Sequence, residues 1–531
     1  MVWYQLSNQK KNMKKNKFSS TDVCFLIASS AKKSYQQLST TYAAIEPPTW
    51  ALLLAQSCRS VGFKVSIVDA NAENLSDNEV LKRVSEFNPR IICLVVYGQN
   101  VNAGTANMRG AVDITNFLKD NEISCPVAFI GSHVQALPIA TLTNEKNIDI
   151  VFTNEGVYAL RNLLKLDNFS SPELKNIKGI AYRKDDEIKI NLPEKVVPTE
   201  RMDIDLPGYA WDLLPYNNNP LDLYRSPMWH AEYDFEKRSP YASLQTSLGC
   251  VFKCDFCMIN LINRNDSEEI GVASHYSNMR FWSPDFIIKE FDKLISMGVQ
   301  IIRIVDEMFL LNPKYYIPLC KKLSMRNKDD KLRMWSYSRI DTVKRLEILK
   351  LVRKAGIKWL CLGIESGDKS VRLEVAKGKF DDVNVRDVIK KIHEADINVM
   401  ANYIFGLPGD TKETMKKTFD LSLELCTAGW NAYAAMALPG SQLYKNALDK
   451  KYKLPDSYEG YSFHSYETQP LPTETLRPDE ILEYRDKSFI NYHTQKPFLD
   501  KVERKFGKKA LDNIKDMTKV NLKRKILGDQ L

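Results

Sequence analysis

No apolar stretch of the ~18 residues needed to cross a bilayer occurs in the 531-residue sequence. The first residues also lack the apolar core of a secretory signal peptide. No internal repeat or long low-complexity segment is present, and the hydrophobic fraction of 44% is ordinary for a globular protein. These absences argue against membrane-spanning, secreted and repeat proteins, and the length predicts two or three domains.

A nucleic-acid partner is not predicted, although the formal net charge is +9. Residues 1–18 contain five lysines and no acid, and residues 501–531 contain ten basic and four acidic side chains. Residues 19–500 therefore carry a net charge of −2. We expect the two basic ends to be solvated and partly mobile. A weak contact of residues 519–525 with a membrane surface or a polyanion is the alternative.

Three of the ten cysteines, Cys250, Cys254 and Cys257, lie within residues 248–257. Cysteine sulfur is the usual ligand of iron–sulfur clusters, so each thiolate can hold one iron of a [4Fe–4S] cluster. The fourth iron would keep an open position, which is where a substrate or cosubstrate binds. A zinc site is disfavoured because no second Cys or His pair lies at a suitable distance. A chance cluster of buried cysteines is the other alternative.

The cysteine spacing resembles that of the radical S-adenosylmethionine (SAM) enzymes. The resemblance implies that the open iron chelates the amino and carboxylate groups of SAM, and that reductive cleavage yields a 5′-deoxyadenosyl radical. The other cysteines show no ligand spacing and are interpreted as buried residues, which favours a reducing, cytoplasmic location: Cys24, Cys58, Cys93, Cys125, Cys320, Cys361 and Cys426.

Residues 20–165 alternate between short apolar runs and amphipathic stretches. This alternation predicts a doubly wound parallel α/β sheet, which binds ligands at the carboxyl ends of its strands. The predicted strands are residues 23–28, 65–69, 91–97, 127–131 and 148–152, and the predicted helices are 49–61, 78–87, 105–119 and 134–142.

The loops at these strand ends resemble those of the cobalamin-binding domain of one radical SAM class. By this resemblance, the cobalamin contacts are Glu46, Tyr97, Gly98, Gln99, Gly131, Ser132, His133, Asn154, Glu155 and Gly156. The Asp-x-His-x-x-Gly motif is missing after the first strand, so a His ligand to cobalt is not expected from that loop. Ser132 also replaces the second Gly of the common form.

Other interpretations of this domain stay open. His133 is more simply a hydrogen-bonded loop residue, and Glu155 can cap a helix that starts near Val157. A nucleotide-binding or purely structural domain is possible too, but the Gly-x-Gly-x-x-Gly fingerprint is absent.

A second alternation begins at Tyr241 and resembles the partial (β/α)6 TIM barrel of the radical SAM superfamily. Its predicted strands are residues 241–246, 300–305, 332–337, 359–364, 398–405 and 431–438. Chemistry in such barrels gathers at the carboxyl ends of the strands. The resemblance implies that SAM is bound there by Phe256, Asp306, Glu307, Arg339, Glu365 and Ser366, although each can also be a structural residue at a strand end.

The predicted fold class is α/β, with a Rossmann-like cobalamin-binding domain, the partial barrel and a helical C-terminal cap. The predicted units are a basic N-terminus (1–19), the cobalamin domain (20–165), a proline-rich connector with a hairpin (166–235), the radical SAM core (236–450) and the C-terminal region (451–531). The cap is expected to close the barrel mouth.

The resemblance implies a radical SAM enzyme with three cofactors, a [4Fe–4S] cluster, SAM and cobalamin, acting on a small-molecule substrate. Methyl transfer to an unactivated centre is the expected chemistry, with an electron donor such as flavodoxin or ferredoxin. Oxidative cyclisation is the first alternative, because the architecture also resembles the anaerobic magnesium-protoporphyrin ester cyclase. A noncatalytic sensor and a barrel enzyme that uses SAM without cobalamin are the others.

Overall fold

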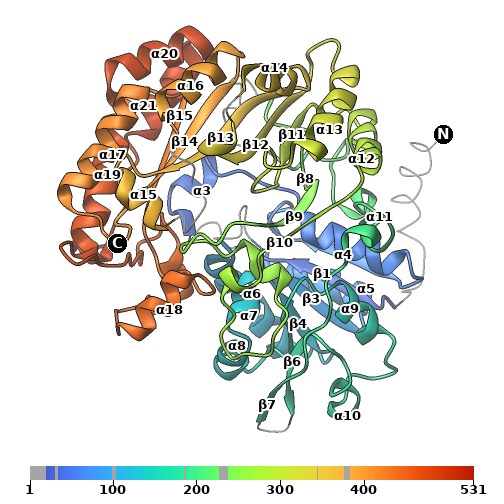
Figure 1. Cartoon of the computed structure of the whole chain (residues 1–531). Coiled ribbons are helices and arrows are strands. Elements are labelled where there is room, and N and C mark those ends of the chain that lie inside the picture. The colour runs from blue at the N-terminus through green and yellow to red at the C-terminus, as the bar shows by residue number, and fades with distance from the viewer. Residues whose placement is uncertain are drawn as a thin grey trace.

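The computed structural model describes residues 20–29, 34–97, 103–184, 187–226, 237–343, 345–375 and 383–531. Two mainly parallel sheets dominate the chain, and Figure 1 shows the N-terminal sheet below the C-terminal one. Gly98 and Gln99, predicted to contact cobalamin, lie outside the described residues. Among the residues described, no helix is long and apolar enough to cross a membrane.

The N-terminal sheet has seven strands in the order β2-β1-β3-β4-β5-β6-β7. Alternate residues of β1 belong to two different apolar clusters, so both faces of the sheet are buried, as the predicted doubly wound arrangement requires. The parallel strands are β1 (Val23–Ile27), β2 (Val65–Asp69), β3 (Ile91–Val95), β4 (Val127–Ile130) and β5 (Ile150–Phe152). The predicted hairpin, β6 (Ile180–Lys184) and β7 (Glu187–Ile190), extends this sheet in antiparallel orientation.

Most helices of this domain lie where the sequence predicts them. The single helix predicted over residues 134–142 is wrong, because Pro138 has no N–H to continue a helix and instead begins a new one. The helices are α3 (Leu38–Thr41), α4 (Thr49–Arg59), α5 (Asp77–Phe87), α6 (Gly104–Asp120), α7 (Ser132–Ala136), α8 (Pro138–Asn144), α9 (Val157–Leu164) and α10 (Ser171–Leu174).

The second sheet has six parallel strands in the order β15-β14-β13-β12-β11-β8, which is the predicted partial barrel. Its strands are β8 (Tyr241–Leu244), β11 (Ile301–Ile304), β12 (Arg333–Arg339), β13 (Ile357–Glu365), β14 (Asn398–Phe405) and β15 (Gly429–Ala434). Its outer helices are α12 (Pro284–Ser296), α13 (Pro313–Arg326), α14 (Leu346–Lys354), α15 (Lys369–Val375), α16 (Val385–Glu394) and α17 (Lys412–Leu425).

The first barrel strand is shorter than the predicted residues 241–246. It ends at Leu244, and the chain then forms β9 (Ser247–Cys250), which pairs with β10 (Asn278–Phe281) in a separate antiparallel hairpin. The Asp306 carboxylate accepts hydrogen bonds from the Thr246 backbone N–H and hydroxyl (both 2.6 Å) and from the Ser247 hydroxyl (2.5 Å). These bonds hold the chain outside the barrel sheet at this point.

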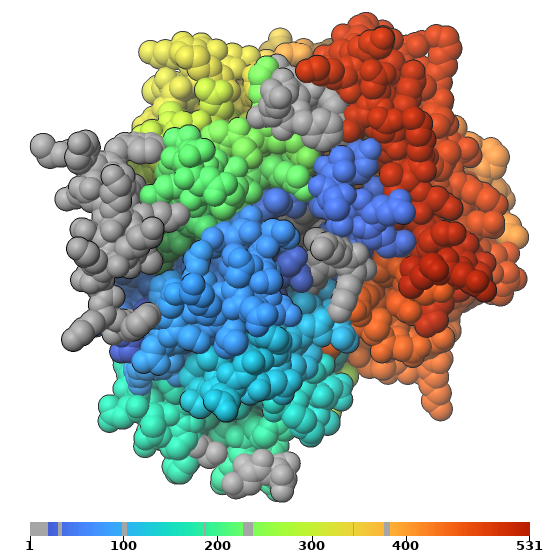
Figure 2. All heavy atoms as spheres, turned by 180° about the vertical axis from the view of Figure 1, so that it is seen from behind, coloured from blue at the N-terminus to red at the C-terminus, as the bar shows by residue number. Residues whose placement is uncertain are grey.

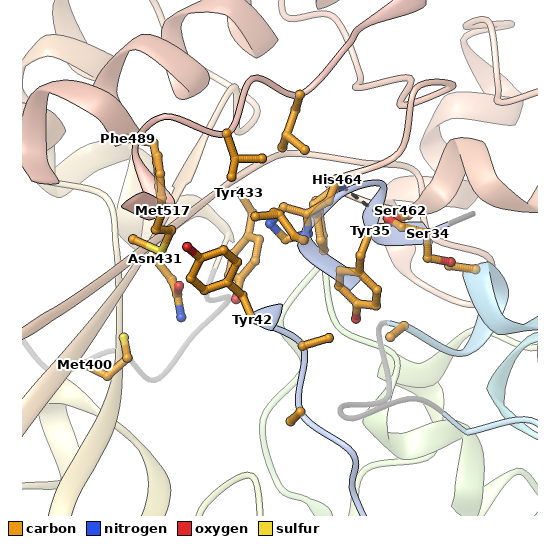
Figure 3. A pocket seen from close by; sticks show the side chains of 18 of the residues that line it. Ser34, Tyr35, Tyr42, Met400, Asn431, Tyr433, Ser462, His464, Phe489 and Met517 are labelled. Carbon is orange, nitrogen blue, oxygen red and sulfur yellow. Dashed lines mark hydrogen bonds between the residues drawn. The ribbon is translucent and has the colours of Figure 1, made fainter. Parts of the chain in front are cut away.

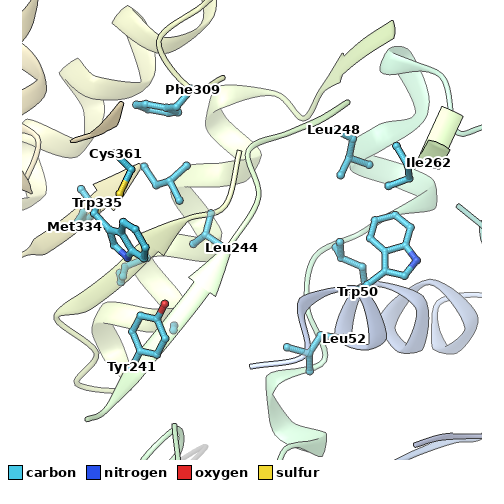
Figure 4. Packing of buried hydrophobic residues seen from close by; sticks show 14 of the residues in the cluster. Trp50, Leu52, Tyr241, Leu244, Leu248, Ile262, Phe309, Met334, Trp335 and Cys361 are labelled. Carbon is cyan, nitrogen blue, oxygen red and sulfur yellow. The ribbon is translucent and has the colours of Figure 1, made fainter. Parts of the chain in front are cut away.

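One apolar core runs from the N-terminal domain into the barrel. Trp50 and Leu52 of α4 belong to the same cluster as Leu248 and Ile262 beside the cysteine loop (Figure 4). The connector adds to this core through Trp211, with only short turns of helix: α11 (Met202–Asp205), η2 (Thr199–Arg201) and η3 (Trp211–Leu213). The two domains therefore pack as one body.

The C-terminal region is helical, as predicted, and most of its last residues are exposed, but Arg524 among them is buried. Figure 2 shows the C-terminal residues packed against a blue N-terminal segment. Arg524 is 1% exposed and donates to the carboxylate of Asp486 (2.9 and 3.1 Å) and to Ser465 O (2.9 Å), so the expectation of a mobile C-terminus is wrong for this segment. The helices are α18 (Gln442–Asp449), α19 (Pro478–Thr494), α20 (Lys496–Phe506) and α21 (Lys508–Met517).

We predict that Arg524→Met lowers the free energy of unfolding by about 3 kcal/mol, because it removes charge-assisted hydrogen bonds from a buried site. Urea denaturation followed by circular dichroism measures the change. Lys519→Met is the control, because the Lys519 side chain is 75% exposed, and we expect it to shift stability by less than about 0.5 kcal/mol. Equal stability of the two variants would contradict a structural role for Arg524.

Candidate functional site

The cysteine loop is held by the hairpin that precedes it and by the 3₁₀ helix η6 (Ile259–Asn263) that follows it. Cys250 is the last residue of β9, and its N–H donates to Asn260 Oδ1 (2.9 Å). Cys257 N–H donates to Cys254 O (3.1 Å), which closes a tight turn between these two residues. Gly249 has a φ of +81°, and a Cβ there would lie 2.2 Å from Asn278 O, so only glycine fits beside β10.

The three cysteines line one cavity of about 200 Å³ at the carboxyl ends of the barrel strands. Among the described residues, no three His, Cys, Asp or Glu side chains converge on a single point as they would around one metal ion. Three thiols spread around one cavity suit a multi-iron cluster better than a single ion, because each thiolate binds a different iron. The donor set therefore fits a [4Fe–4S] cluster.

Burial controls the protonation of these thiols. It raises the pKa of Cys250 to about 11 and that of Cys254 to about 12, and it raises the pKa of Cys257 further above its usual value. The thiols are therefore neutral unless a cation replaces their protons, which is the usual coupling between metal binding and thiol ionisation.

Two of the predicted acids reach this cavity. Glu307 follows β11 and Glu365 ends β13, and both line it. Burial raises the pKa of each to about 7, against the opposing effects of Arg303 on Glu307 and of Arg339 on Glu365. Glu365 also adopts a left-handed φ of +64°, which turns its chain at the strand end.

Asp306 and Ser366 do not line the cysteine cavity. Asp306 is occupied by its three hydrogen bonds from Thr246 and Ser247, and burial raises its pKa to about 6. The Ser366 hydroxyl lies 3.2 Å from Thr418 Oγ1 and accepts from Asp368 N–H (3.1 Å). Both residues shape the loops at the strand ends.

Arg339 and Phe256 both line the cavity. Arg339 donates to both oxygens of Asp341 (2.7 and 2.5 Å). Its guanidinium also lies over the Phe252 ring, 3.5 Å from the centroid, and interacts with Cys254. The structure therefore fixes a guanidinium beside the cysteine loop.

The predicted ligand crevice of the N-terminal sheet contains a cavity of about 140 Å³ at the ends of β1 and β3. Tyr97 lines it, and its hydroxyl accepts a hydrogen bond from Gln135 Nε2 (2.6 Å). Glu46 also lines it but forms an ion pair with Arg303 of the barrel (2.5 Å). Small residues such as Ala28 and Ala43 also line this crevice, which lies at the strand ends where such sheets bind ligands.

The residues after β4 and β5 that were predicted to contact cobalamin do not line this crevice cavity. A Cβ at Gly131 would lie 2.1 Å from Val96 O, so this residue serves a close backbone approach. Ser132 lines a small cavity of about 60 Å³ between the crevice and the cysteine hairpin. His133 is buried, its Nδ1 lies 3.2 Å from Thr105 Oγ1, and burial lowers its pKa to about 4. It lines neither cavity, in line with the simpler interpretation of a hydrogen-bonded residue.

Asn154, Glu155 and Gly156 join the two domains. Asn154 Nδ2 donates to Arg264 O (3.2 Å), and Glu155 forms a buried ion pair with Arg280 of β10 (2.6 Å). Glu155 does not cap α9, because Gly156 is the capping residue, with a φ of +77°. These three residues lie behind the cysteine hairpin and do not line the crevice cavity.

Several residues that position the site were not predicted from the sequence. Arg303 and Arg280 sit inside strands, where a charged side chain gives no sign of its partner. Asn260 and Asn263 of η6 hold the cysteine loop, and Asn263 Nδ2 donates to Asn278 O (3.0 Å). The asparagine spacing after the cysteines was the only available signal.

A larger cavity of about 360 Å³ lies between the barrel, α3 and the C-terminal region (Figure 3). It shares Tyr337 and Tyr433 with the cysteine cavity, and Tyr35 and Glu46 with the crevice. Glu307 and Tyr97 line the small third cavity, so the four cavities are neighbours that share lining residues.

Comparison with known proteins gives two family matches. The Radical SAM superfamily matches residues 244–422, and the B12 binding domain matches residues 36–164. The anaerobic magnesium-protoporphyrin IX monomethyl ester cyclase of Cereibacter sphaeroides is 24% identical over 85% of this chain and 67% of its own length. An uncharacterized methyltransferase of Pyrococcus horikoshii is 25% identical over 78% of this chain and 82% of its own.

A solved structure has the same fold. It is the radical S-adenosylmethionine methyltransferase TsrM from Kitasatospora setae with cobalamin and a [4Fe–4S] cluster bound, at 15% identity, a TM-score of 0.61 and coverage of 81% of this chain and 78% of that one. The chain therefore combines a radical SAM domain with a B12-binding domain, and the two pack together.

Proposed function

We propose that this protein is a cobalamin-dependent radical SAM enzyme that transfers a methyl group to an unactivated centre of a small molecule. The observation that carries the proposal is that the cavities are adjacent and share lining residues. Glu307 lines both the cysteine cavity and the small third cavity, and Tyr97 lines both that cavity and the crevice. Two cofactor sites that share walls can serve one reaction centre.

In this proposal Cys250, Cys254 and Cys257 hold the [4Fe–4S] cluster. The cluster supplies the electron that cleaves SAM, and cobalamin supplies methyl-group transfer. The remaining work belongs to the chain. Its buried cavity walls exclude water, and its strand ends orient the bound groups.

Glu307, Glu365 and Arg339 are the residues that would hold SAM. The two carboxylates can accept hydrogen bonds from an ammonium or ribose hydroxyl group, and a guanidinium matches a carboxylate. Phe256 adds an apolar wall. Asp306 takes a positioning role in place of the direct contact expected from the sequence, because its carboxylate is already saturated by Thr246 and Ser247.

The crevice would hold cobalamin, with Tyr97 and Glu46 in its wall and Gly131 allowing the close approach of β3 and β4. Gly98 and Gln99 remain proposed contacts. His133 is not proposed as a cobalt ligand. We propose a reducing cytoplasmic location and a flavodoxin- or ferredoxin-type electron donor, because the cluster needs one-electron reduction.

Oxidative cyclisation is the second candidate. It is favoured by the similarity to the Cereibacter sphaeroides cyclase over 85% of this chain. Product analysis separates the two, because methylation adds one carbon to the substrate and cyclisation adds none.

We predict that Cys254→Ala abolishes cluster binding and SAM cleavage. The two remaining thiolates would leave a second iron of the cluster without a protein ligand. Anaerobic reconstitution with iron, sulfide and hydroxocobalamin, followed by iron analysis and an assay for 5′-deoxyadenosine with dithionite, tests this. Cys320→Ala, a buried cysteine in α13, should keep both properties. Iron retained at wild-type levels in Cys254→Ala would overturn the assignment.

Neighbouring acids should differ in their effects. Glu307→Gln should weaken SAM binding about tenfold or more with unchanged stability, because it removes a charge-assisted acceptor from the cavity. Asp306→Asn should instead lower the free energy of unfolding by about 1–3 kcal/mol, because it disturbs three buried hydrogen bonds. Equilibrium dialysis with SAM and thermal denaturation measure the two effects, and a reversed pattern would contradict the assigned roles.

Gly131→Ala should remove cobalamin binding and leave the cluster intact. The added methyl group would lie 2.1 Å from Val96 O and would push apart the loop at the crevice. Cobalt and iron analysis of the reconstituted protein measures both cofactors. Gly298→Ala is the control, because it introduces backbone strain at a φ of +81° but meets no atom within 4 Å. Loss of iron and cobalt together would indicate general misfolding.

A further inference from the structure

The inward-facing residues of the barrel form two layers, and each layer lines a different cavity. Alternate residues of a strand face the same side, so inward-facing residues at different points along a strand lie at different depths. Arg339, Glu365 and Asn402 lie toward the carboxyl ends and line the cysteine cavity. The lower layer lines the 360 Å³ cavity and consists of Arg303, Trp335 and Trp359, which pair in register, and of Met400, two residues before Asn402. A closed eight-stranded barrel would fill this layer with side chains.

The open side of this cavity is closed by segments from both ends of the chain. Tyr35 and Tyr42 come from the α3 region, His464 comes from the loop before α19, and residues 520–522 follow α21 (Figure 3). Gln36 fixes these segments to each other, since its Nε2 donates to His464 O (2.7 Å) and its Oε1 accepts from Lys523 N–H (3.2 Å). Specific hydrogen bonds therefore hold together the segments that close the cavity.

The position of the cavity suits a substrate. Its upper wall, Tyr337 and Tyr433, is also the wall of the cysteine cavity, where SAM would bind. Its side wall, Tyr35 and Glu46, is also the wall of the crevice, where cobalamin would bind. A molecule held among the lower barrel residues would face both cofactors. Its volume of about 360 Å³ lies in the range of small-molecule sites.

The charged side chains of the wall already have partners of opposite sign. Arg303 pairs with Glu46 (2.5 Å), and Arg485 pairs with Asp486 (2.9 Å). Burial lowers the pKa of His464 to about 3, so its imidazole is neutral. The rest of the wall combines nine aromatic side chains with aliphatic and small polar residues. An ionised ligand would bring an unmatched charge into this buried space, at a high desolvation cost.

Arg303 has hydrogen-bonding capacity to spare. It is 1% exposed, and its guanidinium lies beside Trp335 and Tyr337, 4.9 and 5.1 Å from their ring centroids. Within the described part of the chain, its Nε and Nη2 atoms have no hydrogen-bond partner. Unsatisfied buried donors are costly, so an acceptor on a bound molecule would be strongly favoured here.

We propose that the substrate is a neutral aromatic molecule that binds in the lower barrel layer and carries a carbonyl-type oxygen, which accepts a hydrogen bond from Arg303. This inference rests on the proposed function and adds the substrate class to it. The aromatic walls hold the ring system by stacking and edge contacts. Arg303 then determines specificity, because it rejects analogues that lack the oxygen.

Three probes of equal size test the proposal: indole-3-acetamide, its anionic counterpart indole-3-acetate, and 3-(2-methylpropyl)indole, which has the shape of the amide but no side-chain acceptor. Isothermal titration calorimetry with the reconstituted full-length protein measures binding. We expect a Kd of about 1 mM for the amide, as for ligands of this size, and affinities at least about tenfold weaker for the other two. Glu46→Gln/Arg303→Met, which removes the donor without leaving its carboxylate unpaired, should abolish the preference for the amide.

Arg386→Met is the matched control, because Arg386 is an exposed residue of α16 paired with Glu424, and it should bind all three probes as the wild type does. The proposal is overturned if the acetate binds as tightly as the amide, if the double variant keeps the preference, or if the amide does not bind at about ten times the expected Kd. Iron content, cobalt content and SAM cleavage are measured on the wild type and on Arg386→Met, whose substitution lies outside both proposed cofactor sites. Loss of these activities would count against the proposed function, whereas a wrong order of probe affinities with the activities intact would count against the substrate class alone.

Discussion

The buried ion pair between Glu155 and Arg280 fixes the cysteine hairpin to the N-terminal domain. Both side chains are no more than 2% exposed, so the stability of the pair depends on the other hydrogen bonds that the two groups make. Glu155 accepts from Val197 N–H (2.5 Å), and Arg280 donates to Val197 O (2.7 Å) and to Asn263 Oδ1 (2.9 Å). Because β10 pairs with β9, this network sets where Cys250 lies relative to the crevice. The position of the cysteine loop relative to the crevice therefore depends in part on this polar junction inside the core.

The sequence predicted those features that depend on local spacing or on the periodicity of strands and helices. The cysteine spacing, the six barrel strands and the strand ends carrying Glu307, Arg339 and Glu365 were all predicted, because the ends of parallel strands must meet at one edge. The sequence did not distinguish the roles of two adjacent acids. Asp306 and Glu307 follow the same strand, but only the structure reveals that Thr246 and Ser247 saturate one of them. A residue's role at a strand end is decided by its neighbours in space.

Contacts between domains were the main source of error. Glu155 follows a strand end of the N-terminal sheet, so it was grouped with the crevice residues. The cysteine hairpin packs against that loop, however, and its Arg280 forms an ion pair with the Glu155 carboxylate. The basic C-terminus was misjudged for the same reason. Its charge suggests a solvated tail, but Arg524 finds a buried partner in Asp486. Single-sequence patterns describe elements, whereas these partners are set by how elements from distant parts of the chain dock.

The incomplete barrel explains why the chain needs both of its flanking regions. Six strands cannot close into the cylinder that eight form, so the lumen stays open on one side and its lower layer is not filled. Left open, the layer around Trp335 and Trp359 would expose aromatic surface to water. The α3 region and residues 520–522 cover it from opposite ends of the sequence, and Gln36 ties them together. A cavity closed in this way keeps water from the cofactor sites while leaving its lining, and therefore its specificity, to segments outside the barrel.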